Sequence, residues 1–258
     1  MELKGKNILV TGGGGFGVGA GICNVLAAYG ARLVINEQDQ GKANAIAKKY
    51  VDALPVAADI SKALEVEAMF SYIEKECGVL HGLVNNAGIG LSRLAHEASE
   101  KEFDRLYGID VRGVWVVSKL FVNQLLKNRL TGNIVNVSSV HAHSTIPGYA
   151  IYASAKSAVE GLTRGMAMEL GKLGIRVNAI APGYVHAEQN YELIRSWTDD
   201  PEKWVEEYIF KEQAINRKIQ PEDCGYSAAF LLSDLSQCIT GQTVYIDCGT
   251  TIKLLGSV

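Results

Sequence analysis

The chain has 258 residues, of which 48% are hydrophobic and 21% charged, and its formal net charge is −3. These values are ordinary for a soluble globular protein and exclude a disordered or collagen-like chain. The slight negative charge argues against nucleic-acid binding through a broad basic face. No apolar stretch reaches the roughly 18 residues of a membrane span, and the run at residues 8–10 is too short for a signal segment. The five cysteines are far apart and form no C-x-x-C pair, which predicts reduced thiols and a cytoplasmic protein.

Short apolar runs alternate with helix-like stretches along the chain. The predicted strands are residues 7–10, 32–35, 55–58, 82–84, 133–137, 176–180 and 244–246, and the predicted helices are residues 18–29, 41–50, 62–76, 100–128 (one helix or two) and 152–173. This alternation is typical of a parallel sheet covered on both faces, and right-handed crossovers then produce a doubly wound, Rossmann-like sheet. We see no repeat or linker, so we expect one α/β domain over residues 1–258 that binds its ligand beyond the carboxyl ends of the strands.

A glycine-rich turn follows the first predicted strand and opens the first helix. It reads Thr-Gly-Gly-Gly-Gly-Phe-Gly-Val-Gly over residues 11–19. Glycines let a pyrophosphate approach the backbone closely, and the helix N-terminus offers free N–H groups and partial positive charge. We therefore expect Gly12, Gly17, Val18 and Gly19 to bind cofactor phosphates.

The next two strands end on acidic residues. Glu37 ends the second strand, where its carboxylate can accept both hydroxyls of an adenosine ribose and would repel a 2′-phosphate. No Arg or Lys follows Glu37, so we predict NAD rather than NADP. Asp59, followed by Ile60, is placed to accept from the adenine amino group, but an Asp before a helix is also a common N-cap.

A candidate proton-transfer group follows further along the chain. Tyr152 and Lys156 are four residues apart on a predicted helix, so both project from one face. A nearby ammonium favours the ionised form of a phenol. Ser139 follows the strand at residues 133–137, where its hydroxyl could bond a carbonyl or alkoxide oxygen.

Together these residues resemble the one-domain branch of the short-chain dehydrogenase/reductase family. The resemblance covers essentially the whole chain: the glycine turn, the Asn-Asn-Ala-Gly segment at residues 85–88, Ser138-Ser139, Tyr152-x-x-x-Lys156 and residues 174–183, which end in Pro182-Gly183. It implies hydride transfer between a nicotinamide and a carbon bearing an alcohol or ketone. Tyr152 would be the general acid/base, Lys156 would assist it and hold the nicotinamide ribose, and Ser139 would bind the substrate oxygen.

The resemblance also implies partners and further cofactor contacts. It suggests a homotetramer or homodimer with residues 100–128 and 152–173 at one interface. Cofactor contacts are expected at residues of three segments: Asn86, Ala87, Gly88, Pro182, Gly183 and Val185. Val185 is included because Ala187 stands where many relatives carry a Thr that bonds the nicotinamide carboxamide. Without that Thr, the backbone around Val185 would hold the carboxamide.

Two departures leave alternatives open. Four residues rather than three separate Gly12 from Gly17, a spacing that also resembles the sugar-nucleotide epimerase branch, although the chain leaves no room for that branch's C-terminal domain. Asp110 stands at the helix position that is usually the catalytic Asn. It could accept from a proton-relaying water, bond to Lys156 through that water, stabilise protonated Tyr152, or be merely structural.

A third departure concerns the acid/base. Tyr149 lies seven residues before Lys156, the tyrosine spacing of the related enoyl-thioester reductases, whereas Ser139 and Tyr152 favour alcohol or ketone chemistry.

The segment at residues 184–217 is expected to be a substrate lid. Tyr184 in it and His141 after Ser139 are candidate substrate contacts. Imidazole, phenol and indole groups would suit a small polar substrate such as a sugar, polyol or hydroxy-ketone. We expect no metal, because Tyr/Lys hydride chemistry needs none. The alternatives are a 3-oxoacyl-thioester reductase that uses NADPH and a non-catalytic NAD-binding sensor.

Overall fold

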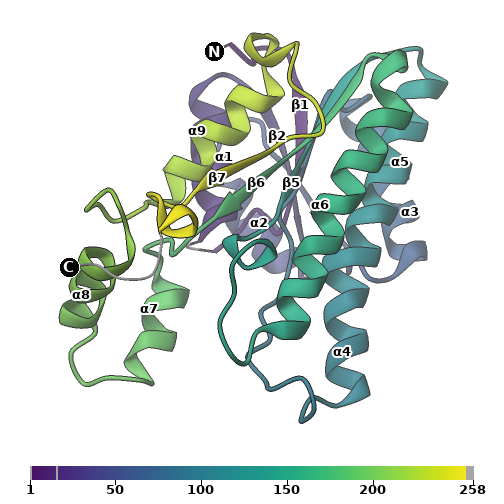
Figure 1. Ribbon diagram of the computed structural model, residues 1–258. Helices are drawn as coiled ribbons and strands as arrows, with labels where there is room; N and C mark the ends of the chain where they lie inside the picture. The colour runs from purple at the N-terminus through teal and green to yellow at the C-terminus, as the bar shows by residue number, and fades with distance from the viewer. Residues whose placement is uncertain (1, 16, 254–258) are drawn as a thin grey trace.

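The computed structural model describes residues 2–15 and 17–253, so Phe16 of the glycine turn lies outside the described residues. Its centre is a seven-stranded sheet in the order β3-β2-β1-β4-β5-β6-β7, in which each neighbouring pair is parallel (Figure 1). The strands are β1 (Asn7–Thr11), β2 (Arg32–Glu37), β3 (Leu54–Ala57), β4 (Gly82–Asn85), β5 (Gly132–Val137), β6 (Ile175–Pro182) and β7 (Thr243–Ile246). The order reverses direction between β1 and β4, which is the switch point where such sheets bind ligands.

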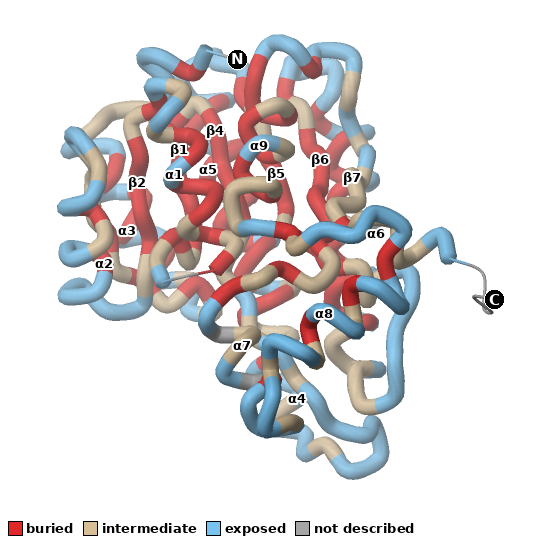
Figure 2. Tube along the Cα trace, turned by 90° about the vertical axis from the view of Figure 1, so that its left-hand side faces the viewer, coloured by how far each residue is buried: buried red, intermediate tan, exposed pale blue. Residues whose placement is uncertain are grey.

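Helices cover both faces of the sheet. One face carries α1 (Val18–Ala28), α2 (Gln40–Ala47) and α9 (Pro221–Leu232), and the other carries α3 (Ala63–Cys77), α5 (Val114–Lys127) and α6 (Ala150–Leu170). Three further helices, α4 (Glu100–Tyr107), α7 (Glu188–Arg195) and α8 (Pro201–Glu212), lie beyond the carboxyl ends of the strands (Figures 1 and 2). The predicted Rossmann-like fold is confirmed.

Alternate residues of each strand feed two separate hydrophobic cores. Ile8 and Val10 of β1 pack with α1 and α9, whereas Leu9 between them packs with α3, α5 and α6. All three side chains are buried, as Figure 2 shows along the central strands. This two-sided burial explains why the strands read as continuous apolar runs rather than as alternating ones.

The helix pair α1 and α9 packs at backbone contact distance. A Cβ at Gly21 would clash with the backbone of Pro221, and a Cβ at Gly225 would lie 2.5 Å from the carbonyl oxygen of Gly21. Glycine at these positions therefore lets the two helices approach closely.

Most predicted elements are found with shifted ends, and the differences have local causes. The helix predicted from Tyr152 begins at Ala150 and ends at Leu170, and its last three predicted residues form a 3-10 turn, η3 (Gly171–Leu173). The stretch at residues 100–128 is two helices joined by a π-helical segment, η1 (Gly108–Gly113). Helices α7, α8 and α9 lack a predicted counterpart, although Pro at the first position of α8 and α9 is a helix-start signal.

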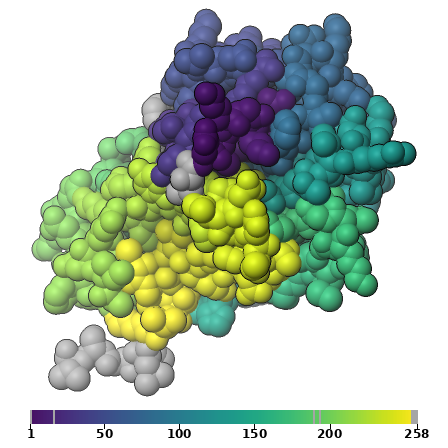
Figure 3. All heavy atoms as spheres, turned by 90° about the horizontal axis from the view of Figure 1, so that it is seen from above, coloured from purple at the N-terminus to yellow at the C-terminus, as the bar shows by residue number. Residues whose placement is uncertain are grey.

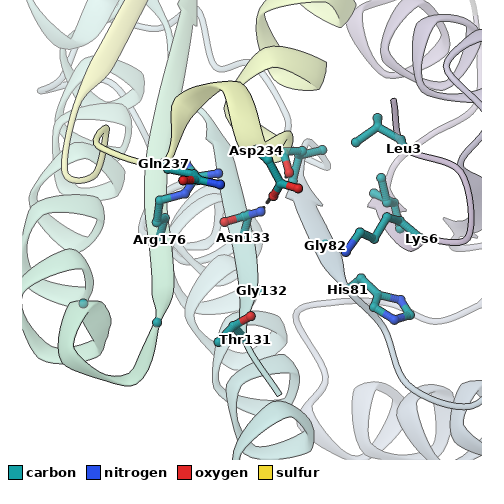
Figure 4. Close-up of a pocket in the computed structure, with 14 residues that line it drawn as sticks. Leu3, Lys6, His81, Gly82, Thr131, Gly132, Asn133, Arg176, Asp234 and Gln237 are labelled. Atoms are coloured by element: carbon teal, nitrogen blue, oxygen red, sulfur yellow. Dashed lines mark hydrogen bonds between the residues drawn. The ribbon is translucent and has the colours of Figure 1, made fainter. Parts of the chain in front are cut away.

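The amino ends of the strands surround a cavity remote from the predicted motifs. Figure 3 looks onto this end, and Figure 4 shows Lys6 and His81 on one side of the cavity and Arg176 and Gln237 on the other. The Arg176 guanidinium donates to the carbonyl oxygens of Leu231, Ser233 and Ile239. Its donors thus cap the end of α9 and the following turn, so this cationic group has a structural role.

Candidate active site

Two adjoining cavities open at the carboxyl ends of the strands. The first, of about 280 Å³, lies along the glycine turn, and the second, of about 200 Å³, contains Ser139, Tyr152 and Lys156. They share four lining residues: Val18, Asn86, Gly88 and Ile89. The result is one elongated site that runs from Glu37 to Tyr152, the form that an extended dinucleotide requires.

The glycine turn is held to the neighbouring strand by the Asn-Asn-Ala-Gly segment. Asn86 donates its side-chain amide to the carbonyl oxygens of Thr11 and Gly12, and the Thr11 hydroxyl accepts from the backbone N–H of Asn86. Gly12 has φ +59°, and a Cβ at Gly19 would clash with the Gly12 carbonyl. The backbone can therefore reach this conformation only with glycine at both positions.

The extra residue of the turn has a structural explanation. The backbone N–H of Gly14 donates to Oε1 of Glu37 at 2.8 Å, across the gap between the turn and the end of β2. A Cβ at Gly14 would lie 2.6 Å from that same oxygen, so a larger residue there would displace the Glu37 carboxylate. The longer turn thus fixes the Glu37 carboxylate at the edge of the first cavity.

The adenine end of the site is partly as expected. Ala58 and Ile60 line the first cavity, but Asp59 does not, and its Oδ1 accepts from both the backbone N–H and the hydroxyl of Ser61. The adenine contact of Asp59 stays a prediction, whereas its side chain caps the following turn. Arg105, on α4, also lines this cavity. Sequence reasoning missed it because only the tertiary fold brings α4 to β3.

Three side chains that the sequence predicts to be catalytic line one cavity. Ser139 follows β5, and Tyr152 and Lys156 project from the first turns of α6 into the same cavity. The Lys156 ammonium donates to the carbonyl oxygen of Val137 at 3.2 Å and lies 5.6 Å from the centre of the Tyr152 ring. The Ser139 hydroxyl accepts from the backbone N–H of His141 at 3.3 Å, which leaves its own proton to donate.

Asp110 meets Lys156 directly. It lies in η1, is fully buried, and its Oδ2 is 3.0 Å from the Lys156 ammonium nitrogen. Its Oδ1 accepts from the backbone N–H of Ile89 at 2.9 Å. Burial opposes the charge on Lys156, but the Tyr152 and Asp110 charges outweigh it and raise the pKa of Lys156.

An aromatic wall stands beside the catalytic tyrosine. The His141 ring stacks on Tyr149 at 4.7 Å between centroids and meets Tyr152 edge-on at 5.7 Å. Its Nδ1 is 3.0 Å from the Thr145 hydroxyl, and burial lowers the pKa of His141, which favours the neutral imidazole. Tyr149 also meets Tyr152 edge-on, at 6.2 Å between centroids, but neither Tyr149 nor His141 is among the residues that line the catalytic cavity, whereas Tyr152 is.

The predicted lid has a small hydrophobic core of its own. Ile194 of α7 packs with Val205 and Ile209 of α8, and four aromatic side chains cover them: Tyr184, Tyr191, Trp204 and Tyr208. Burial raises the pKa of Tyr184 to about 12, so this phenol stays protonated.

The base of this segment is fixed near the end of β6. Val185 pairs with Ile219 in a parallel bridge, and the Val185 carbonyl accepts from the side chain of Asn190. Val185, Asn190, Pro182 and Gly183 all line the catalytic cavity. The sequence places Asn190 only within the predicted lid segment. Its position in the cavity depends on α7 beginning at Glu188, just after β6 and Val185.

The residues present fit a nicotinamide dinucleotide. The cradle is made of glycines that have no space for a Cβ, the carboxylate of Glu37 lies at one end, and the Tyr/Lys pair lies at the other. Within the described residues, no three His, Cys, Asp or Glu side chains are grouped so that they could hold a metal ion. No helix in residues 2–15 and 17–253 is long and apolar enough to cross a membrane.

Known proteins resemble the chain along nearly its whole length. A family model described as "Enoyl-(Acyl carrier protein) reductase" matches residues 14–251. The oxidoreductase UcpA of Salmonella typhimurium is 37% identical, and the alignment covers 97% of this chain and 96% of the relative.

Solved structures agree with this result. The gluconate 5-dehydrogenase of Burkholderia cenocepacia, in complex with NADP and tartrate, has a TM-score of 0.89 and 30% identity, covering 98% of both chains. The 3-ketoacyl-(acyl-carrier-protein) reductase of Brucella melitensis, complexed with NADH, has a TM-score of 0.86 and 32% identity, covering 97% of this chain and 100% of that one. With these similarities and the Ser139, Tyr152 and Lys156 geometry, the chain belongs to the short-chain dehydrogenase/reductase family of nicotinamide-dependent oxidoreductases.

Proposed function

We propose that this protein transfers a hydride between NAD(H) and an alcohol or ketone carbon of a small polar substrate. The observation that carries the proposal is the convergence of Ser139, Tyr152 and Lys156 in one cavity continuous with the glycine cradle. The cofactor, when bound, supplies or accepts the hydride at its nicotinamide ring.

The chain's own residues would handle the proton and the substrate oxygen. Ser139 donates its hydroxyl proton to that oxygen, because its lone pair already accepts from His141. Tyr152 gives a proton to the oxygen during reduction and takes one during oxidation, as a positioned general acid/base. Lys156, held by Asp110 and the Val137 carbonyl, keeps a positive charge beside the phenol.

We propose NAD as the preferred cofactor. The Glu37 carboxylate is fixed at the end of β2 by Gly14, where it can accept from ribose hydroxyls and would repel a 2′-phosphate. The first cavity also contains Arg105, but this side chain projects from α4 rather than from the residues after Glu37. Among the similar structures one is complexed with NADP and another with NADH, so the preference depends on Glu37 in this chain.

We propose a polar, hydroxylated substrate that extends from the catalytic cavity toward His141 and Tyr184, two residues that are not among those lining the cavity itself. His141 lies against Tyr152 and has a neutral imidazole, which can both donate and accept a hydrogen bond. The Tyr184 hydroxyl lies 3.5 Å from Nδ1 of His186. Tyr184 also belongs to the aromatic cluster within residues 184–217, the segment that we propose as the substrate lid. Tartrate accompanies the gluconate 5-dehydrogenase structure, a ligand of the same chemical class.

A 3-oxoacyl-thioester reductase that uses NADPH is the second candidate. It is favoured by the likeness to the 3-ketoacyl reductase of Brucella melitensis and by the description of the family model, and it is opposed by Glu37. A non-catalytic NAD sensor is disfavoured because Tyr152 and Lys156 are both present and line the same cavity.

We also propose a homotetramer or homodimer that pairs through α5 and α6. Within these two helices, Val117 and Met166 are buried in the core, but Trp115 is 46% and Met168 is 84% exposed. An apolar hollow lined by Gly161 and other residues lies between the two helices. Sedimentation of the full chain tests this pairing, and a monomer at micromolar concentration would exclude it.

A cytoplasmic location completes the proposal. All five cysteines are free thiols, the state that a reducing compartment maintains. Burial raises the pKa of Cys23 and of Cys224 to about 12, so these two thiols are packing groups rather than nucleophiles.

Cofactor titration followed by a substrate panel tests the proposed function. NAD and NADP are titrated separately by fluorescence quenching, and then polyols, sugars, aldonic acids, hydroxysteroids and hydroxyacyl thioesters are screened for reduced-nicotinamide absorbance. We expect tighter NAD binding and turnover of a polyol, sugar or hydroxy acid. NADP preference with thioester turnover would favour the second candidate, and NAD binding without any turnover would favour the sensor.

A further inference from the structure

We propose that Asp110 is a positioning residue whose carboxylate balances the positive charge of Lys156 and thereby raises the pH at which this site becomes able to oxidise an alcohol. The inference rests on the proposed function and adds a regulatory property to that same site. Among the alternatives left open for Asp110, it selects the one in which the carboxylate stabilises protonated Tyr152, and it assigns that effect to a direct ion pair with Lys156.

The geometry leaves little freedom to either partner. Asp110 is 0% exposed and Lys156 is 5% exposed, and their charged atoms lie 3.0 Å apart. Oδ2 of Asp110 has no other hydrogen-bond partner among the described residues. A Cβ at Gly88 would lie 2.7 Å from that oxygen, so the backbone closes over the pair and excludes a bridging group from that side.

The local backbone directs Asp110 toward Lys156. The residue sits within the π-helical segment η1, where the extra residue per turn displaces a side chain relative to an ordinary helix. The second carboxylate oxygen is anchored by the backbone N–H of Ile89, just beyond β4. Gly113, at the end of η1, packs against Ile60, where a Cβ would lie 2.9 Å from the side chain.

Charge counting gives the direction of the effect. The titratable groups that act on Lys156 are Tyr152 on its own helix and Asp110 on η1, while β5 contributes only the Val137 carbonyl. His141 and Tyr149 both meet the Tyr152 ring edge-on, at 5.7 Å and 6.2 Å between centroids, and the lowered pKa of His141 favours its neutral form. The cluster of carboxylate, ammonium and phenol therefore has no net charge before Tyr152 ionises and one negative charge afterwards.

Removal of the carboxylate changes both states by one charge. With Asn at position 110, the cluster would pass from one positive charge to none, which is the easier ionisation in a buried site. At neutral pH the natural cluster therefore holds a phenol that is ready to protonate a carbonyl. Alcohol oxidation, which needs the ionised phenol, requires a higher pH.

The test is a tyrosinate absorbance titration of the full chain. The protein has 11 tyrosines, so the signal of Tyr152 is obtained by subtracting the titration of a Tyr152→Phe variant. The measurement is made with Asp110 present and with Asp110→Asn, each with its own Tyr152→Phe reference. We expect Asp110→Asn to lower the midpoint by about one pH unit, the low end of the effect of a charge at 4–6 Å, since Tyr152 lies beyond Lys156.

A matched control and a second variant make the result decisive. Glu160→Gln removes a carboxylate one helical turn after Lys156 that instead accepts from the Ser138 hydroxyl, and its shift should be less than half as large. Asp110→Ser keeps an acceptor for Ile89 without charge, and it replaces Asp110→Asn if that variant fails to fold. An unchanged or raised midpoint in the folded variant overturns the proposal, as does an equal shift in Glu160→Gln.

Kinetics supply a second measurement. With NAD and a substrate that the panel identifies, the pH midpoint of kcat/KM for oxidation should move downward by the same amount. A purely structural role would lower kcat without moving that midpoint. Because the absorbance titration needs no substrate, failure of the proposed function leaves it valid, and the two failures are distinguishable.

Discussion

Glu37→Gln should weaken the preference for NAD over NADP, because we expect that preference to depend on the single negative charge of Glu37. The glutamine can still accept from the Gly14 N–H, so the glycine turn keeps its anchor while the negative charge is lost. Two unit charges about 4 Å apart interact by roughly 4 kcal/mol near a protein surface and by about 1 kcal/mol in water. Glu37 is half-buried, and a 2′-phosphate carries nearly two charges, so we take about 3 kcal/mol for the repulsion.

That energy corresponds to about a hundredfold change in relative affinity. The assay measures the dissociation constants of NAD and NADP, and kcat/KM for each, in the natural protein and in Glu37→Gln. We expect the NADP-to-NAD ratio to rise by about a hundredfold at low salt and by less at high salt, because ions screen the repulsion.

Asp39→Asn is the matched control. Asp39 is two residues away and equally negative, but it caps α2 through the N–H of Lys42 and is absent from the lining of the dinucleotide cavity. If Glu37→Gln changed the ratio by less than about threefold, or if Asp39→Asn changed it as much, the reasoning from the fixed carboxylate would be refuted.

Further predictions concern catalysis and stability. Tyr152→Phe should lower kcat by about 10²–10⁴-fold while NAD still binds, whereas Tyr149→Phe should retain turnover, and steady-state kinetics of the two variants identifies the acid/base. Burial, and then the positive charge of Lys6, lower the pKa of His81, whose ring accepts from a backbone N–H of β1. Because this folded pKa lies below the unfolded value of about 6.5, the stabilisation is present above that pH and is lost as the pH falls below it. His81→Gln should therefore have a flatter pH dependence in urea unfolding between about pH 7 and about pH 5, and an identical slope would contradict this. Gly21→Ala should cost about 2–3 kcal/mol in the same assay, because its Cβ meets the backbone of Pro221.

Elements with strong local patterns were predictable from the sequence. The β1 strand, the glycine turn and α1 follow one another in the predicted order. Tyr152 and Lys156 lie on the same face of one helix, because their spacing is about one helical turn. Helices α7, α8 and α9 were not predicted, because none of them has a long stretch of apolar residues at helical spacing. Their apolar side chains are recognised only by their contacts with other elements.

Contacts between distant segments required the tertiary structure. The sequence places Asp110 at a helix position and leaves its partner open, and only the packing of η1 against α6 puts its carboxylate 3.0 Å from Lys156. The same holds for the bond from Gly14 to Glu37, which explains the extra residue of the turn, and for Arg105, which α4 brings to the cofactor cavity.

Sequence alone was enough to predict the fold class and the family, and to propose Ser139, Tyr152 and Lys156 as the reacting side chains. These follow from hydrophobic periodicity and from motifs in which every residue lies within a few positions of the next. The charge state of the site, the anchoring of Glu37 and the path of the cofactor cavity were decided by the tertiary structure. They depend on distances of a few ångströms between residues that are 23 to 46 positions apart, and electrostatic energies change with such distances while sequence patterns do not record them.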